Sequence, residues 1–130
     1  MTVVVVVFVV LLVGGVLAFF LSAPPAIDVT GINFVSPDNA CGLDGATDYG
    51  FNGTAGQSLE FTYQLYNGLP NNATTPCTIA NITTTTPGFS VTGANTPLTI
   101  PAGVNSTQVF SFQVNFPSNA YTGVLTLVIT

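Results

Sequence analysis

The chain has 130 residues, 48% of them hydrophobic, and its formal net charge is -5. It contains no lysine, arginine or histidine, so five acidic residues supply all of its side-chain charge. We therefore expect no nucleic-acid partner, because neutralising phosphates requires basic side chains. The absence of histidine and lysine also removes most general bases, Schiff-base nucleophiles and imidazole metal ligands. We predict neither an enzymatic activity nor a bound cofactor.

The chain opens with an apolar segment, MTVVVVVFVVLLVGGVLAFFLS, over residues 1–22. A helix from Thr2 to Ser22 would be about 31 Å long, close to the roughly 30 Å hydrocarbon thickness of a bilayer. Valine favours strands in water, whereas in lipid each backbone group must be satisfied within the segment. We predict an α-helix over 1–22 that packs through nine residues: Val3, Val7, Val10, Leu11, Gly14, Gly15, Leu17, Phe20 and Leu21.

Three other interpretations of this segment compete with the helix. A secretory signal is disfavoured, because the segment lacks a basic n-region and exceeds the usual length of the apolar region. A single-pass anchor usually carries a basic cytoplasmic flank, and its absence here suggests that a basic leader has been removed. Insertion of the valine run into a neighbour's sheet as an added strand is the third possibility, although 21 apolar residues are about twice what a strand needs.

The sequence Ala23-Pro24-Pro25 ends the apolar segment, because proline lacks an amide proton and restricts the residue before it. We predict a hinge over 23–26, with Pro24 and Pro25 at its centre, followed by a single domain over 27–130. In Ser58 to Tyr66, and again in Thr107 to Phe116, apolar and polar residues alternate, as in strands with one buried face.

Five shorter stretches also have the character of strands, and Gly, Pro and Asn turns separate them: Ile27 to Val35, Cys77 to Thr83, Phe89 to Thr92, Pro97 to Ile100 and Gly123 to Thr130. About seven strands in roughly 100 residues predict an all-β, antiparallel sandwich of immunoglobulin-like type. The whole chain is then α+β by content, with a long N-terminal helix before the sandwich. A row of aromatic residues from Phe110 to Phe116 is either core or a ligand-stacking surface, and its strand spacing favours core.

The two cysteines, Cys41 and Cys77, favour a disulfide in a domain that otherwise looks secreted; the alternative is two buried free thiols. Four N-glycosylation acceptor patterns begin at Asn52, Asn72, Asn81 and Asn105. Some such matches are expected by chance in a chain rich in Asn and Thr. Together, the cysteines and the acceptor patterns predict an extracellular location.

Three of the five acids, Asp38, Asp44 and Asp48, lie in one Gly-rich stretch. Oxygen ligands on a flexible loop suit calcium, but the spacing does not match an EF-hand. Asp, Asn and Gly are also ordinary turn formers. A solvated loop is therefore the preferred interpretation, and these acids are weak candidates for a metal site.

An apolar N-terminal helix, a proline hinge and a sandwich rich in Thr, Asn and acceptor patterns resemble the archaeal type IV pilins, especially those of adhesion pili. The resemblance implies a filament core of packed helices, an outer sheath of sandwich domains, and insertion in the membrane before assembly. It also implies a prepilin peptidase and an assembly ATPase with its platform protein as partners, beside copies of the chain itself. Bacterial type IV pilins have glutamate at the fifth residue, whereas this chain has Val5. The remaining alternatives are a swimming-filament archaellin and a membrane-anchored binding domain of the cell surface or surface layer.

Overall fold

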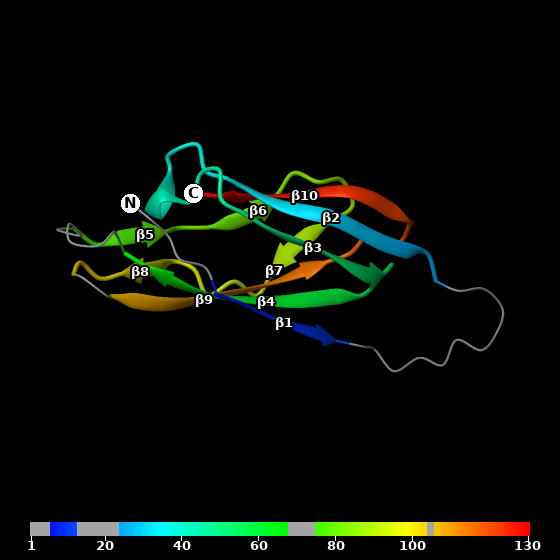
Figure 1. Ribbon diagram of the computed structural model, residues 1–130, viewed down its shortest axis with the longest axis horizontal. Helices are drawn as coiled ribbons and strands as arrows, with labels where there is room; N and C mark the ends of the chain where they lie inside the picture. The colour runs from blue at the N-terminus through cyan, green and yellow to red at the C-terminus, as the bar shows by residue number, and fades with distance from the viewer. Residues whose placement is uncertain (1–5, 13–23, 68–74, 104–105) are drawn as a thin grey trace.

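The computed structural model describes residues 6–12, 24–67, 75–103 and 106–130. In these residues the protein is all-β, with ten strands in three sheets and one short 3-10 helix, η1 (Ala40–Gly42) (Figure 1). Within this part of the chain, no helix has the length and apolar character needed to cross a membrane.

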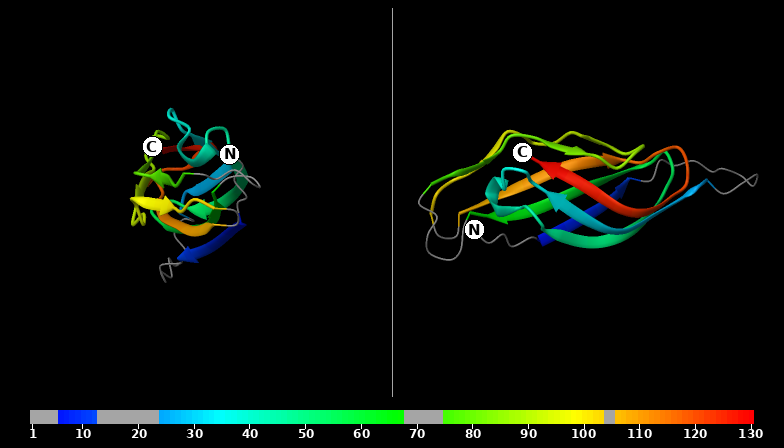
Figure 2. Two further views of the ribbon diagram at one scale, coloured as in Figure 1. Left: turned by 90° about the vertical axis from the view of Figure 1, so that its left-hand side faces the viewer. Right: turned by 90° about the horizontal axis from the view of Figure 1, so that it is seen from above.

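The first sheet contains four strands in the order β1-β4-β9-β7. They are β1 (Val6–Leu12), β4 (Ser58–Tyr66), β9 (Thr107–Asn115) and β7 (Ser90–Thr92), and every pairing in this sheet is antiparallel. The sheet forms the lower layer in Figure 1, and β1 lies at its outer margin. The view along the long axis also places β1 at the margin of the molecule (Figure 2, left).

The second sheet has the order β3-β2-β10-β6, formed by β3 (Thr47–Thr54), β2 (Ala26–Val35), β10 (Tyr121–Ile129) and β6 (Ile82–Thr84). The expectation of a wholly antiparallel fold is wrong for one pair, because β10 runs parallel to β2. These two strands are separated by most of the chain, so no tight turn forces them to run in opposite directions.

A small third sheet pairs β5 (Cys77–Ile79) with β8 (Leu98–Ile100) at the end of the molecule where η1 lies (Figure 1). The expected single strand from Cys77 to Thr83 is therefore two strands, β5 and β6, that belong to different sheets. The chain changes sheets at Ala80 and Asn81, whose amides both donate to the carbonyl of Thr130.

The core lies between the two large sheets and consists of the apolar residues that alternate along their strands. The predicted core row of β9 is confirmed, since Phe110, Phe112 and Val114 are each at most 1% exposed. The equivalent row of β4 is also buried: Leu59, Phe61, Tyr63 and Leu65. These aromatic residues are therefore packing residues of the core and not a ligand-stacking surface.

The prediction of an α-helix over 1–22 is wrong for Val6–Leu12, which forms β1. The valines supply the physical reason, because β-branched side chains favour the extended backbone in the absence of lipid. The open side of β4 supplies the hydrogen-bonding groups that an extended segment needs. Residues 1–5 and 13–22 of the predicted helix lie outside the described residues.

Candidate assembly site

The site begins with β4, whose alternating sequence builds one buried row and one outer row of side chains. The outer row is polar: Ser58, Thr62 and Gln64 are half-buried and Glu60 is exposed. On one side β4 pairs with β9 over nine positions, from Ser58 opposite Asn115 to Tyr66 opposite Thr107. Its other side pairs with β1. We call the β1-facing side of Ser58–Gln64 the β4 edge.

β1 pairs with the β4 edge over seven positions, from Val6 opposite Gln64 to Leu12 opposite Ser58. Three positions of β1 are in register with the buried row of β4: Val7, Val9 and Leu11. The other four are in register with the polar outer row: Val6, Phe8, Val10 and Leu12. β1 is thus apolar at every position, although it pairs with a strand that is apolar on one face.

A rigid aromatic layer supports β4 from inside the core. The ring of Phe61 stacks on that of Phe112, with 5.5 Å between centroids, and Tyr63 stacks on Phe112 at 5.9 Å. The ring of Phe34 from β2 meets Tyr63 edge-on at 5.6 Å. Because closely packed rings leave little room for movement, this layer holds the inner face of β4 in place.

Tyr63 also ties the two sheets together through its hydroxyl group, which donates a hydrogen bond of 3.0 Å to Asp48 Oδ2 on β3. The Tyr63 side chain is only 1% exposed. Burial raises the pKa of this hydroxyl well above its usual range, and the neighbouring Asp48 carboxylate raises the pKa further. The neutral phenol is therefore the form that the fold requires.

The predicted assembly residues are placed only in part. Val7, Val10 and Leu11 lie in β1, whereas Val3, Gly14, Gly15, Leu17, Phe20 and Leu21 lie outside the described residues. The predicted hinge residues Pro24 and Pro25 are exposed and directly precede β2. The Pro25 carbonyl accepts a hydrogen bond of 2.9 Å from the amide of Ala55.

The three candidate metal ligands do not come together as a site. Asp44 accepts a hydrogen bond from the Ser36 amide, and Asp38 accepts one from the Ser36 hydroxyl. Asp48 lies on β3 and not in the loop, and it accepts hydrogen bonds from the Tyr49 amide and the Tyr63 hydroxyl. Across the described ranges, no group of three acidic, cysteine or histidine side chains is placed to hold a metal ion. These carboxylates instead order turns and join strands.

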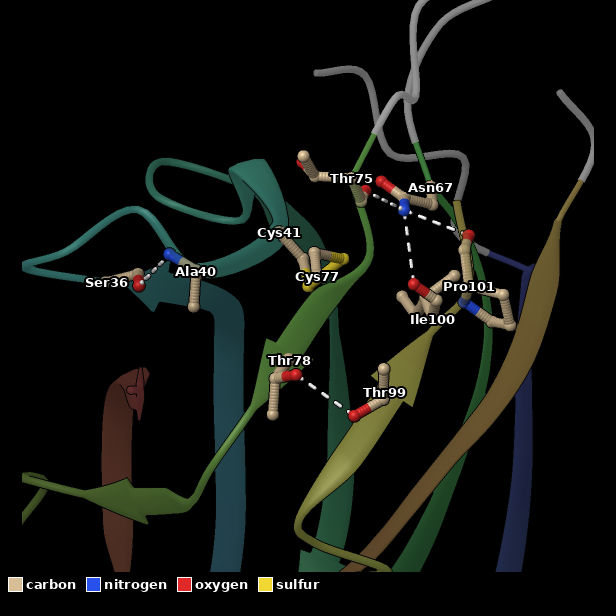
Figure 3. Close-up of a disulfide and its surroundings, with 10 residues drawn as sticks. All are labelled: Ser36, Ala40, Cys41, Asn67, Thr75, Cys77, Thr78, Thr99, Ile100 and Pro101. Atoms are coloured by element: carbon tan, nitrogen blue, oxygen red, sulfur yellow. Dashed lines mark hydrogen bonds between the residues drawn. A yellow bond between two sulfur atoms is a disulfide. The ribbon is translucent and has the colours of Figure 1, made fainter. Parts of the chain in front are cut away.

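The predicted disulfide is confirmed: Cys41 of η1 is bonded to Cys77 of β5, with 5.4 Å between their Cα atoms (Figure 3). Beside it, the buried amide of Asn67 donates to the carbonyl oxygens of Thr75, Ile100 and Pro101 at 2.9 to 3.1 Å (Figure 3). The disulfide and Asn67 together fix η1, the end of β4 and the small sheet. In the described part of the chain, every buried polar side-chain atom has a hydrogen-bond partner. This end of the molecule therefore has a structural role.

Two of the four glycosylation candidates can be placed. Asn52 is exposed on β3, an outer strand of the second sheet, and Asn81 is exposed between β5 and β6. Asn72 and Asn105 lie outside the described residues. Both placed side chains are accessible to a modifying enzyme.

Sequence reasoning did not find β3 or the role of Asp48. Thr47–Thr54 contains two glycines, one aspartate and one asparagine, which are depleted in strands. The signal that points to the strand is the alternation of Tyr49 and Phe51 with smaller or polar residues. The pairing of the β4 edge with the N-terminal segment carries no local signal, because it joins residues about 50 positions apart.

No known protein family, curated protein or solved structure matches this chain. The resemblance to archaeal type IV pilins therefore rests on the sequence alone: the apolar N-terminal segment, the prolines after it and the composition of the domain.

Proposed function

We propose that the chain is a structural subunit of an extracellular, pilus-type filament, and that copies of it assemble through the N-terminal apolar segment. The observation that carries the proposal is β1, a strand that is apolar in both of its rows and pairs with the β4 edge. A strand with one buried face alternates apolar and polar residues, whereas continuous apolar residues are typical of strands covered on both faces.

An apolar outer row in β1 would be stabilised by a cover that polar register partners do not offer. Val6, Phe8, Val10 and Leu12 are in register with polar residues of β4. Full burial of a side chain of this kind is favourable by roughly 1.5 to 3 kcal/mol, so burying four contributes about 6 to 12 kcal/mol. A second copy of the chain would supply that cover in a filament, and repetition of a contact that does not close yields an open helical polymer.

The rest of the molecule suits a durable coat. Its surface is solvated mainly by uncharged Thr, Ser and Asn residues, and a disulfide closes one end of the domain. Such a surface depends little on pH and salt, because few of its groups titrate or are screened. The disulfide and the two exposed acceptor sites support a location outside the cell.

We further infer an immunoglobulin-like sandwich for the folded domain and adhesion as the role of the filament. The stacking of two four-stranded sheets over one core supports the first inference. The resemblance to adhesion pilins supports the second. By the same resemblance, a prepilin peptidase and an assembly ATPase with its platform protein would process and assemble the subunit. The same resemblance implies that the N-terminal segment is inserted in the membrane before assembly.

Electron microscopy and sedimentation of the full-length chain in detergent test the proposal. We expect fibres from the unmodified chain and small particles from Val10→Asp, because the substitution places a charge in the outer row of β1. Val124→Asp is the matched control, since Val124 is 42% exposed on β10 of the other sheet, and this variant should still form fibres.

Two outcomes would contradict the filament. Fibres of normal appearance from Val10→Asp would show that the apolar row is not an assembly surface. Dissolution of the unmodified chain as single small particles would instead favour a membrane-anchored surface domain.

A further inference from the structure

We propose that β1 is exchanged between copies, so that β1 of one subunit pairs with the β4 edge of the next. This inference rests on the proposed filament and names the contact that builds it. The partner is a second copy of this chain, and the acceptor is the backbone of Ser58–Gln64.

The first step of the argument is that the β4 edge requires a strand. β9 satisfies one side of β4, and without β1 the amide and carbonyl groups along the other side of Ser58–Gln64 would be unpaired. Such an edge is a template for any available strand. The ring contacts of Phe61 and Tyr63 with Phe112 join β4 to β9 and do not involve β1.

The second step is that the connection between β1 and β2 is long enough to reach a neighbour. Thirteen residues, 13–25, join β1 in the first sheet to β2 in the second. Fully extended, they span up to about 43 to 47 Å. Packed sheets lie only about 10 Å apart, and a nine-residue strand is about 30 Å long. The connection is therefore far longer than the crossing within one subunit needs, and it can reach along a whole neighbouring domain.

The third step is that exchange keeps every hydrogen bond of the pairing and adds contact between copies. The seven-position register of β1 on β4 is the same whether the two strands belong to one chain or to two. Pairing within one chain is favoured by the high effective concentration of a linked segment. Within one chain, the outer row of β1 is in register with polar residues of β4. Exchange is favoured when it also brings a second subunit over this outer row.

The fourth step concerns geometry. Each subunit then donates one strand and accepts one, and the donor and acceptor surfaces are different. A contact of this heterologous kind continues as an open chain unless the rotation between subunits closes a ring. Strand exchange therefore accounts for a fibre from a single type of subunit.

Cysteine cross-linking of the full-length chain tests the exchange. Val10 and Glu60 are paired in the register, and both native cysteines are already bonded to each other. We expect the double variant Val10→Cys/Glu60→Cys to give, after mild oxidation, a ladder of covalent oligomers on a non-reducing gel. Mixed single variants, Val10→Cys with Glu60→Cys, should give one cross-linked dimer whose bridge joins the two chains.

The matched control replaces Glu60→Cys by Gln64→Cys. Gln64 lies in the same outer row, four residues along β4, or about 13 Å from position 60. A disulfide requires Cα atoms closer than about 7 Å, so Val10→Cys with Gln64→Cys should not cross-link. A second pair, Phe8→Cys with Thr62→Cys, repeats the test at another register position should the first pair not fold.

The outcomes separate the exchange from the filament itself. If the double variant forms fibres but runs on the gel as a monomer with an internal bridge, the exchange is overturned. The filament proposal then still holds. A covalent species that stops at a closed dimer would overturn the open chain of exchanged strands. Small particles with only internal bridges would overturn both proposals.

Discussion

Tyr63→Phe should change how stability depends on alkaline pH, because the folded state holds this phenol neutral. Burial, the Asp48 charge and the hydrogen bond to Asp48 all raise the pKa of Tyr63 above the value near 10 of an exposed tyrosine. Below pH 10 the phenol is protonated in both states and contributes no pH dependence. Above pH 10 the unfolded chain loses this proton and the folded one keeps it, so the free energy of unfolding falls as pH rises.

The free energy of unfolding should fall with a slope that approaches about 1.4 kcal/mol per pH unit. At pH 12 the unmodified chain should have lost about 2.7 kcal/mol of stability. The composition simplifies the interpretation of this slope. The chain has no lysine, arginine or histidine, and both cysteines are bonded, so none of these side chains titrates alongside the tyrosines. Tyr63→Phe removes the hydrogen bond to Asp48 and should lower stability at pH 7 by about 1 to 2 kcal/mol. It also removes the alkaline loss, so the stability curves of variant and unmodified chain should cross between pH 10 and 12.

The assay is rapid denaturant unfolding at a series of pH values from 6 to 12, with phenolate absorbance recorded in parallel. Tyr49→Phe is the control: this residue is 90% exposed on β3, and its variant should keep the slope of the unmodified chain. An unchanged alkaline slope in Tyr63→Phe would refute the reasoning, since the loss would then arise elsewhere in the molecule.

Three further predictions follow from the core, the disulfide and the surface. Phe112→Ala should destabilise the fold by about 3 to 5 kcal/mol in denaturant unfolding, because this ring is 1% exposed. Val109 is 52% exposed on the same strand, so Val109→Ala should change the free energy of unfolding by less than about 0.5 kcal/mol. An equal effect of the two variants would contradict the assigned core. Reduction of the Cys41–Cys77 bond, which links residues 36 positions apart, should lower the unfolding midpoint by the equivalent of roughly 3 to 4 kcal/mol. An unchanged midpoint after complete reduction would show that the disulfide does not stabilise the fold. Mass spectrometry of the native protein should find a glycan on Asn52, which Asn52→Gln abolishes; a peptide without added mass at this exposed site would count against glycosylation there.

The sequence by itself determined the absence of basic side chains and the buried rows of two strands. The chain has no basic side chains of the kind that neutralise phosphates in nucleic-acid binding, and no tertiary arrangement can supply them. The buried rows of β4 and β9 could be predicted because alternation along a strand is a local pattern that a single buried face imposes. The cysteine pair could be predicted because the chain offers one possible disulfide.

The tertiary structure decided the features that depend on partners distant in sequence. An all-apolar segment such as Val6–Leu12 has no period that separates helix from strand, so only the unpaired side of β4 makes it β1. The same reason explains why β3 and the Asp48–Tyr63 hydrogen bond were not found, and why the parallel pairing of β2 with β10 was not expected. Local pattern sets the face that a strand buries, whereas the neighbour of that strand is set by contacts that form only when the whole domain packs.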